Sequence, residues 1–480
     1  MNHNVPRATL RAKGLHPKQG LAFFSMAILY LFYYFCKYNL GPATDDIQNE
    51  FGISSAAFGW VMTTFTLVYA GGQFINGFLG DRYGPKNILI LGGLGSVIAN
   101  LYFGISASLT FFVLFWAMNG YFSSCGWAPG SRILFNWFPE KRWGTYMGIY
   151  NALCYTGGAI VTIVAGFAIS YLGWRGAFSI PAAFLLVMTL VFMIVGKNKP
   201  QDAGLQPEWE QPHSGDQPVR RTGAKEYWAA FSNYRMILAY VSGFGANFVR
   251  WGIITWMVKI LKVHVSEGGF GIPLIIAGII ASLAHWGGAF FSIVLGVVTD
   301  RVFKGMRWQT ITIGFVLAAL PLFYIAQGPK TITGATLWTV WVPPEKAKTV
   351  ARKPQTAPAT PKTAPAATAM AATERTAATE PAKVPVPITT GILLLSLAMF
   401  LSGGLIQAVQ TPLFDLPGDI LGKELSGTGV GILDGWMYVG ASFAGVFLGW
   451  WLDSFGLLAG VTLMAFVSVA SGLVIIPIRK

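Results

Sequence analysis

The chain has 480 residues, of which 54% are hydrophobic and only 11% are charged, and its formal net charge is +14. A soluble domain carries about 25% charged residues, so this composition excludes a water-soluble enzyme of several domains, and the hydrophobicity excludes a disordered protein. No basic patch is interleaved with aromatic residues, which argues against nucleic-acid binding. Apolar stretches of about 20 residues recur along the chain and predict a polytopic membrane protein.

Twelve apolar segments are each long enough to cross the bilayer as a helix. They predict an all-α membrane protein rather than a β-barrel, because the apolar runs are continuous instead of alternating. The first segment is too long for the apolar region of a signal peptide and lacks a small-residue cleavage site, so we interpret it as a true span. The predicted spans are 20–40, 56–78, 87–107, 109–135, 145–171, 176–196, 233–261, 271–298, 309–327, 388–411, 427–450 and 453–477.

Two polar segments divide these spans. Residues 1–196 are predicted to form a tail and a six-helix bundle, residues 197–232 a cytoplasmic loop, and residues 233–480 a second six-helix bundle. Residues 343–387 interrupt the second bundle and are dominated by Ala, Thr, Pro and Lys. Such a composition cannot bury enough apolar surface to fold, and it predicts a flexible linker.

Lysine and arginine residues in short loops predict the orientation. The loops near Arg82, Lys141 and Arg301 share one side of the membrane, whereas the loop after the first span carries the acidic residues Asp45 and Glu50. The positive-inside rule therefore predicts that both termini are cytoplasmic and that the linker lies on the outer face.

A short motif, Gly-x-x-x-Asp-Arg, occurs twice, each time after the second span of a six-span half. The two aspartates are 219 residues apart, which predicts two duplicated halves, as in transporters whose substrate site lies between parallel repeats. The glycine permits two helices to approach closely, and the aspartate can accept hydrogen bonds from helix N-termini and from arginine. We expect a charge latch at the cytoplasmic mouth. Its predicted residues are Asp81, Arg82, Asp300 and Arg301.

An ionisable side chain in the middle of a span is costly unless it is paired or faces a polar cavity. Lys37 lies on the first span of the first half, and Arg250 lies 213 residues later on the first span of the second half. One cation from each half predicts an anion site, because a guanidinium matches phosphate or carboxylate oxygens in pairs and an ammonium adds a mobile point charge. The alternative is that both side chains snorkel to the outer interface.

Other polar residues within the spans are candidates for the same site. Asp434 can select substrates that carry hydrogen-bond donors, balance a bound cation, take a proton, or make a structural hydrogen bond. His285 can titrate near neutral pH and couple or gate transport, or it can pack as a neutral side chain. The further candidate substrate ligands are Tyr33, Tyr34, Gln73, Tyr155 and Asn247. Polar residues of this kind often join helices instead.

The three cysteines, Cys36, Cys125 and Cys154, lie in apolar segments without metal-ligand spacing, which is typical of small buried side chains. The sequence contains no recognisable pairing of a nucleophile with a base and no metal-ligand cluster. We therefore expect neither an enzyme nor a metal or cofactor.

Five stretches carry more specific motifs: Tyr33-Tyr-Phe-Cys-Lys-Tyr-Asn39, and residues 119–130, 150–158, 249–256 and 427–435. With the doubled loop, they resemble the major facilitator superfamily over essentially the whole chain. The narrower resemblance is to the organophosphate:phosphate antiporters, which include glycerol-3-phosphate, hexose-phosphate and sugar-phosphate exchangers. The resemblance implies the major facilitator fold, with two pseudo-symmetric six-helix bundles. It also implies that the phosphate group sits between Lys37 and Arg250.

Two positions depart from that family's pattern. Relatives usually carry arginine, often Arg-Lys, where this chain has Cys36-Lys37-Tyr38, and the position on the eighth helix that is often acidic is His285. A lysine does not bind phosphate through two parallel donors. These departures bear more on inorganic-phosphate exchange than on anion transport.

The sequence predicts secondary transport of a small organic anion, preferably a sugar phosphate or glycerol phosphate, in exchange for inorganic phosphate by alternating access. We expect a multi-pass protein of the inner (plasma) membrane that works as a monomer, with the lipid bilayer and a small anionic substrate as its partners. Two alternatives stay open. One is proton-coupled symport of a sugar acid or other carboxylate, and the other is a membrane sensor that binds a sugar phosphate without transporting it.

Overall fold

The computed structural model describes residues 8–10, 14–53, 55–209, 223–329, 333–342 and 384–479. Almost all of them are helical, because a backbone in hydrocarbon must satisfy its own hydrogen bonds. Within these residues, nine stretches are long and apolar enough to cross a membrane. Helices α3 and α7, of 29 and 30 residues, and the α5–α6 pair complete the twelve predicted crossings.

The first half contains eight helices among the described residues, and their bounds follow the predicted spans closely. They are α1 (Pro17–Tyr38), α2 (Leu40–Phe51), α3 (Ser55–Tyr83), α4 (Pro85–Ile105), α5 (Leu109–Ser124), α6 (Trp127–Trp137), α7 (Trp143–Leu172) and α8 (Gly176–Val195). Helix α2 occupies the predicted acidic loop. It is held by an ion pair of 2.9 Å between Glu50 and Arg175. Hydrogen bonds from Arg175 and Trp174 lower the pKa of Glu50 below its usual range.

The second half begins after a polar segment, of which residues 210–222 lie outside the described residues. Its helices are α9 (Ala224–Ser232), α10 (Tyr234–Lys262), α11 (Leu274–Arg301), α12 (Arg307–Ala326), α13 (Thr390–Ala408), α14 (Gln410–Leu421), α15 (Ser426–Phe455) and α16 (Leu457–Val474). Short 3-10 turns connect several helices: η1 (Glu140–Arg142), η2 (Pro200–Ala203), η3 (Val265–Glu267), η5 (Lys423–Leu425) and η6 (Ile476–Ile478).

Two predicted spans are broken helices, and proline explains both breaks. The span 109–135 divides into α5 and α6 at Cys125–Gly126, and Pro129 follows as the third residue of α6. The span 388–411 divides into α13 and α14 at Val409, and Pro412 is again the third residue of the second piece. A proline lacks the N–H group, and its ring clashes with the carbonyl four residues earlier, so the helix breaks there.

The described residues include two small strand pairs besides the helices. Strand β1 (Ala8–Leu10) pairs in parallel with β2 (Leu205–Pro207), and β3 (Thr336–Val342) pairs antiparallel with β4 (Val384–Thr389). The prediction of a flexible linker over 343–387 is thus wrong for its last four residues, which belong to β4 and pair with β3. The remainder, residues 343–383, lies outside the described residues.

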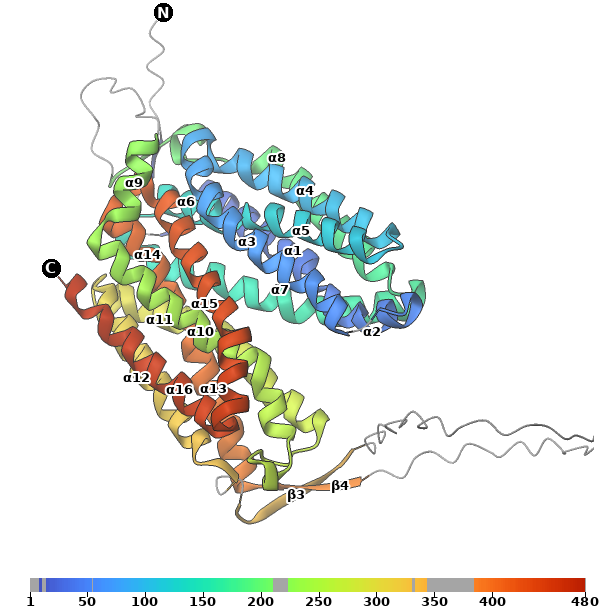
Figure 1. Ribbon diagram of the computed structural model, residues 1–480. Helices are drawn as coiled ribbons and strands as arrows, with labels where there is room; N and C mark the ends of the chain where they lie inside the picture. The colour runs from blue at the N-terminus through green and yellow to red at the C-terminus, as the bar shows by residue number, and fades with distance from the viewer. Residues whose placement is uncertain are drawn as a thin grey trace, which may run out of the picture.

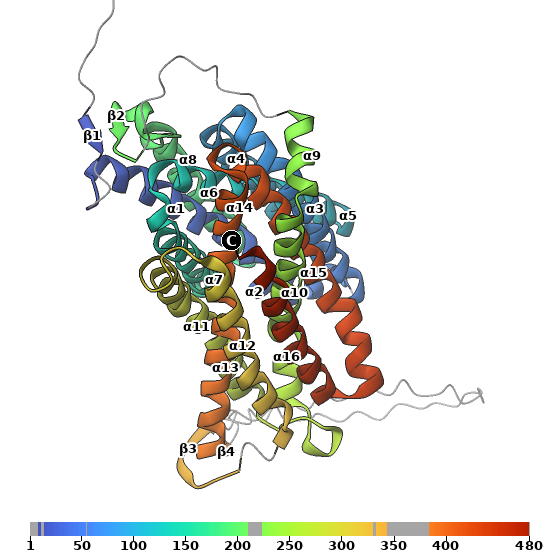
Figure 2. The ribbon, with the colours of Figure 1, turned by 90° about the vertical axis from the view of Figure 1, so that its left-hand side faces the viewer.

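The helices form two bundles that meet at one end and diverge toward the other (Figure 1). Helices α1 to α8 lie together, as do α10 to α16, and Figure 2 shows the second group lengthwise, with the β3–β4 strand pair at its lower end. Between the bundles, α3 packs against α15 and α7 packs against α11. We call the closed end, which contains Asp81 and Asp300, the latch end.

Large apolar side chains cover the outside of the bundles, as expected for a surface in contact with lipid. Tyr171, Ile194 and Ile105 are 82%, 78% and 73% exposed. Together with the apolar helices, this surface identifies a multi-pass membrane protein.

Glycines permit the close crossings between the bundles. A Cβ atom on Gly77 of α3 would overlap the carbonyl oxygen of Gly427 on α15, and a Cβ atom on Gly296 of α11 would overlap the carbonyl oxygen of Gly144 on α7. The repeated motif contributes Gly77 and Gly296, so the same glycine produces the crossing in each half.

We expect Gly77→Ala to lower the melting temperature of the detergent-solubilised protein, because the added methyl group meets backbone that has little room to move. Overpacking of this kind costs about 2 kcal/mol. Gly71→Ala is the matched control, since a Cβ at Gly71 on the same helix meets nothing within 4 Å. Equal melting temperatures for the two variants would contradict the close crossing.

Candidate functional site

The aspartate of the first motif binds the first turn of a helix from the other bundle. Asp81 Oδ2 accepts hydrogen bonds from the backbone N–H of Thr428 at 2.6 Å and from its hydroxyl at 2.7 Å. Arg132 Nε lies 3.3 Å from the other carboxylate oxygen. The N-terminus of α15 carries unpaired N–H groups and a partial positive charge, both of which favour a carboxylate.

The second motif makes the corresponding contact in the opposite direction. Asp300 Oδ2 accepts from the backbone N–H and hydroxyl of Thr145 at 2.7 and 2.6 Å, and Oδ1 accepts from the N–H of Gly144 at 3.1 Å. Thr145 lies in the first turn of α7. Each bundle therefore donates one helix N-terminus and one aspartate to the closed end.

The arginines of the two motifs are not part of these contacts. Arg82 and Arg301 are both exposed, and Arg82 lies over the rings of Phe78 and Tyr83. Arg132, from the fourth span, is the arginine that contacts Asp81.

A buried charge cluster that the sequence did not predict accompanies Asp300. Arg307 Nε lies 3.0 Å from Asp419 and 3.8 Å from Asp415, both on α14. Its guanidinium also donates to the backbone oxygen of Glu140 at 3.2 Å, across the bundle interface. The signal available in the sequence was the spacing of Asp415 and Asp419, which places both on one face of a helix.

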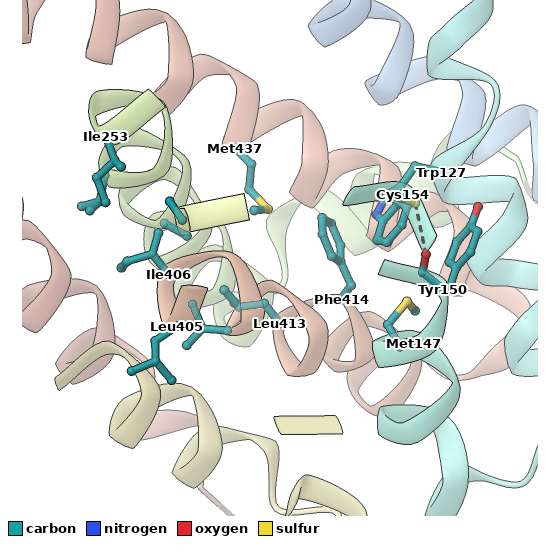
Figure 3. Packing of buried hydrophobic residues seen from close by; sticks show 14 of the residues in the cluster. Trp127, Met147, Tyr150, Cys154, Ile253, Leu405, Ile406, Leu413, Phe414 and Met437 are labelled. Atoms are coloured by element: carbon teal, nitrogen blue, oxygen red, sulfur yellow. Dashed lines mark hydrogen bonds between the residues drawn. The ribbon is translucent and has the colours of Figure 1, made fainter. Parts of the chain in front are cut away.

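Aromatic side chains fill the interface between the latch and the centre of the molecule. Trp127 stacks on Tyr150 with ring centroids 4.8 Å apart, and Phe414 from the other bundle meets Trp127 edge-on at 4.8 Å. Figure 3 shows Phe414 between the second-bundle residues Leu413 and Met437 and the first-bundle residues Trp127 and Tyr150. The apolar core is continuous across the bundles here, and it closes this end of the central space.

A cavity of about 340 Å³ lies between the bundles. Helices α1 and α7 of the first bundle and α10 and α11 of the second contribute its walls. The lining residues are Tyr34, Tyr38, Cys154, Tyr155, Gly158, Ala159, Arg250, Ser282, His285 and Trp286. Four of the predicted site residues, Tyr34, Tyr155, Arg250 and His285, are among them.

Arg250 is held by neutral partners from the second bundle and by a ring from the first. Its Nη1 donates to Gln410 Oε1 at 3.2 Å, and Gln410 Nε2 donates to Asn247 Oδ1 at 3.0 Å. The guanidinium lies 5.2 Å from the centre of the Tyr155 ring. Nε is buried and has no hydrogen-bond partner among the described residues, so the side chain retains donor capacity. Asn247 positions Arg250 through Gln410 and does not line the cavity.

Aromatic rings surround Lys37. Its Nζ lies 3.9 Å from the Tyr69 ring centre, 5.0 Å from that of Tyr438 and 5.4 Å from that of Tyr34. It donates to the Tyr438 hydroxyl of the other bundle at 2.6 Å. Such rings attract a cation through the negative potential of their faces. Sequence reasoning missed Tyr438, although it lies one turn from Asp434 on the same helix face.

Asp434 is 5% exposed on α15 and makes no hydrogen bond or salt bridge within the described residues. Lys37 and Arg250 are the two positive charges that act on its carboxylate. The three groups together carry one net positive charge when all are ionised.

Five predicted substrate ligands are not among the residues that line the cavity: Lys37, Tyr33, Gln73, Asn247 and Asp434. Tyr33 is 1% exposed and donates its hydroxyl to the backbone oxygen of Leu89 at 2.5 Å, so it joins α1 to α4. Gln73 is fully buried, at 0% exposure, and its amide has no hydrogen-bond partner among the described residues. Its backbone lies at the α3–α15 crossing beside Gly431. In a single sequence, adjacent tyrosines do not reveal which of them faces the cavity.

Comparisons with known proteins agree with this fold. A family model described as Major Facilitator Superfamily matches residues 26–344. The chain belongs to the major facilitator superfamily. A solved structure titled as the superfamily transporter FucP in the outward conformation superposes with a TM-score of 0.67 at 10% identity, covering 96% of this chain and 100% of that one.

Three relatives by sequence are a probable hexose phosphate transport protein of Chlamydia pneumoniae (28% identical), the glycerol-3-phosphate transporter of Bacillus subtilis (26%) and the membrane sensor protein UhpC of Escherichia coli (25%). The matched regions cover 63%, 59% and 58% of this chain and 70%, 66% and 64% of the relatives. These relatives confirm the narrower resemblance to the organophosphate:phosphate antiporters. Their names describe transporters and a sensor rather than enzymes.

We expect Asp300→Asn to open the latch end more often, because an amide NH₂ group cannot accept the hydrogen bonds that the carboxylate accepts. A cysteine at Ser292, which is 0% exposed beside the α7–α11 crossing, reports the opening. Hydrogen bonds to a charged group are worth about 2 kcal/mol, so we expect maleimide labelling of Ser292→Cys to rise about thirtyfold, measured by mass spectrometry of the labelled peptide.

The control for this experiment is Asp453→Asn, which removes an exposed aspartate of α15. It should leave the labelling rate at Ser292→Cys unchanged. A rate in the Asp300→Asn background equal to the rate in the control would contradict the latch.

Proposed function

We propose that the protein transports a small organic anion, most specifically a sugar phosphate or glycerol phosphate, in exchange for inorganic phosphate. The observation that carries the proposal is the pair Lys37 and Arg250. One cation comes from each bundle: Arg250 lines a cavity of about 340 Å³, and Lys37 Nζ lies 5.4 Å from the ring centre of Tyr34, which lines the same cavity. The named relatives that transport hexose phosphate and glycerol 3-phosphate support the same substrate class.

Arg250 has N–H groups that remain available to donate hydrogen bonds to a phosphate group. Its Nε has no hydrogen-bond partner among the described residues, and only one of its terminal nitrogens binds a protein side chain. A guanidinium binds phosphate oxygens through two parallel N–H groups. Lys37 then supplies a second positive charge after leaving the Tyr438 hydroxyl.

The two motif aspartates and the aromatic layer close the latch end, and the central cavity lies beyond them. We propose that the latch end is cytoplasmic, with both termini on that side, so this conformation faces outward. The transport cycle then requires that the contacts of Asp81 and Asp300 break while the opposite ends of the bundles approach each other, as in rocking transporters.

Exchange, rather than net transport, follows from electrostatics. An empty carrier would have to move two poorly neutralised cations through a closed state in a medium that penalises buried charge. A bound anion neutralises these cations, so the loaded carrier reorients more easily than the empty carrier in either direction. We propose residues 1–196 and 233–480 as the two moving units, joined by a cytoplasmic loop, in a monomer of the inner membrane.

A sensor is the second candidate, because a named relative of comparable similarity is a membrane sensor protein. Binding of an organophosphate without any flux across the membrane would favour it. Proton-coupled symport of a carboxylate would instead show pH-dependent uptake without a counter-anion.

We expect liposomes loaded with radioactive phosphate to release it when an external organophosphate is added. Lys37→Ala and Arg250→Ala should each slow exchange at least about tenfold, since a hydrogen bond to a charged group is worth about 1.5–3 kcal/mol. Lys259→Ala is the matched control, because Lys259 is exposed on the same helix as Arg250. Release from wild-type protein without any external anion would contradict obligatory exchange.

A further inference from the structure

His285 on α11 and Arg250 on α10 line the same cavity. Nδ1 of His285 lies 3.3 Å from Gln407 Oε1. The orientation of that amide is fixed independently, because Gln407 Nε2 donates to the backbone oxygens of Ala284 at 2.7 Å and Gly403 at 3.2 Å. Backbone carbonyls only accept hydrogen bonds, so the nitrogen of the amide must face them and the oxygen must face the histidine.

This arrangement determines which imidazole nitrogen carries the proton. An amide oxygen is an acceptor, so Nδ1 of His285 must be the donor, and in the neutral ring Nε2 is then a bare acceptor. Nε2 makes no hydrogen bond with any described residue. The cavity that His285 lines therefore presents a fixed hydrogen-bond acceptor on its α11 wall, apart from the donors of Arg250.

We propose that His285 is a specificity residue that accepts a hydrogen bond from a hydroxyl group of the substrate through Nε2. The inference rests on the proposed function and deepens it. A hydrogen bond to Nε2 favours polyhydroxylated organophosphates over organophosphates with a plain alkyl group. The phosphate group binds Arg250 and Lys37, and the polyol part extends along α11.

Two neighbours on the same helix fit that assignment. Trp286 is 57% exposed and lines the cavity, and its ring offers a flat apolar face to the carbon skeleton of a sugar. Ser282 is one turn earlier on α11 and also lines the cavity. Its hydroxyl donates to the backbone oxygen of Ile279 at 2.7 Å, which leaves its lone pairs as a further acceptor.

Two variants separate this role from a purely structural one. In His285→Asn the amide group matches the position of Nδ1, so it preserves the bond to Gln407 and removes the acceptor in the cavity. In His285→Gln the amide group reaches the position of Nε2, so it preserves the cavity acceptor and loses the bond to Gln407. A residue that only joins α11 to α13 would tolerate the first change and suffer from the second.

The test compares each hydroxylated probe with its deoxy partner at pH 7.5. Glycerol 3-phosphate is compared with n-propyl phosphate, and glucose 6-phosphate with its monodeoxy forms, as inhibitors of phosphate homoexchange in liposomes. A neutral hydrogen bond is worth about 1 kcal/mol, so we expect wild-type protein and His285→Gln to prefer one hydroxylated probe by about fivefold or more. We expect His285→Asn to lose this preference while its inhibition by n-propyl phosphate is unchanged.

Equal preferences in wild-type protein and His285→Asn would overturn the inference. His264→Asn, at an exposed histidine, is the control for a nonspecific histidine effect. If phosphate homoexchange is absent, the proposed antiport fails separately, and equilibrium binding of the same probe pairs to the solubilised protein still measures the preference. No difference between the members of every pair in that binding assay would also overturn the inference.

Discussion

The positive charges of Lys37 and Arg250 inside an apolar double bundle constrain the rest of the structure. Neither side chain makes a salt bridge within the described residues. Burial of a charge is costly unless other groups solvate it. The protein solvates Lys37 with aromatic faces and a phenol, and it solvates Arg250 with an amide and a ring. These partners are weaker than carboxylates, so an incoming anion can compete with them.

The closed end of the molecule uses the opposite strategy. There Asp81 and Asp300 each lie on a helix N-terminus of the other bundle, where hydrogen bonds and the helix dipole satisfy their charges. Glycines bring the helices close enough for these contacts, and the aromatic layer around Trp127 and Phe414 separates them from the cavity. The contacts are strong but local, so two groups of hydrogen bonds can break without disrupting either bundle.

The repeated motif illustrates how far the sequence alone could lead. Its two copies predicted a duplicated architecture and an aspartate that binds a helix N-terminus, and both contacts have that form in the structure. The assignment of the motif arginines was less successful, because arginine has a long, flexible side chain and neighbours in sequence do not determine its partner. Arg132, about 50 residues away along the chain, contacts Asp81, whereas Arg82 is exposed.

The sequence by itself determined the membrane class and the twelve crossings, and it placed one cation on the first span of each half, because hydropathy and charge depend only on composition along the chain. Tertiary structure alone decided which side of each helix meets the cavity. It separated Tyr34 from Tyr33, left Gln73 at a helix crossing, and brought Tyr438 to Lys37 across 401 residues of sequence. It also placed Gln407 Oε1 3.3 Å from Nδ1 of His285. Helix rotation and the register between bundles depend on packing against distant residues, and a single sequence does not encode these in any local pattern.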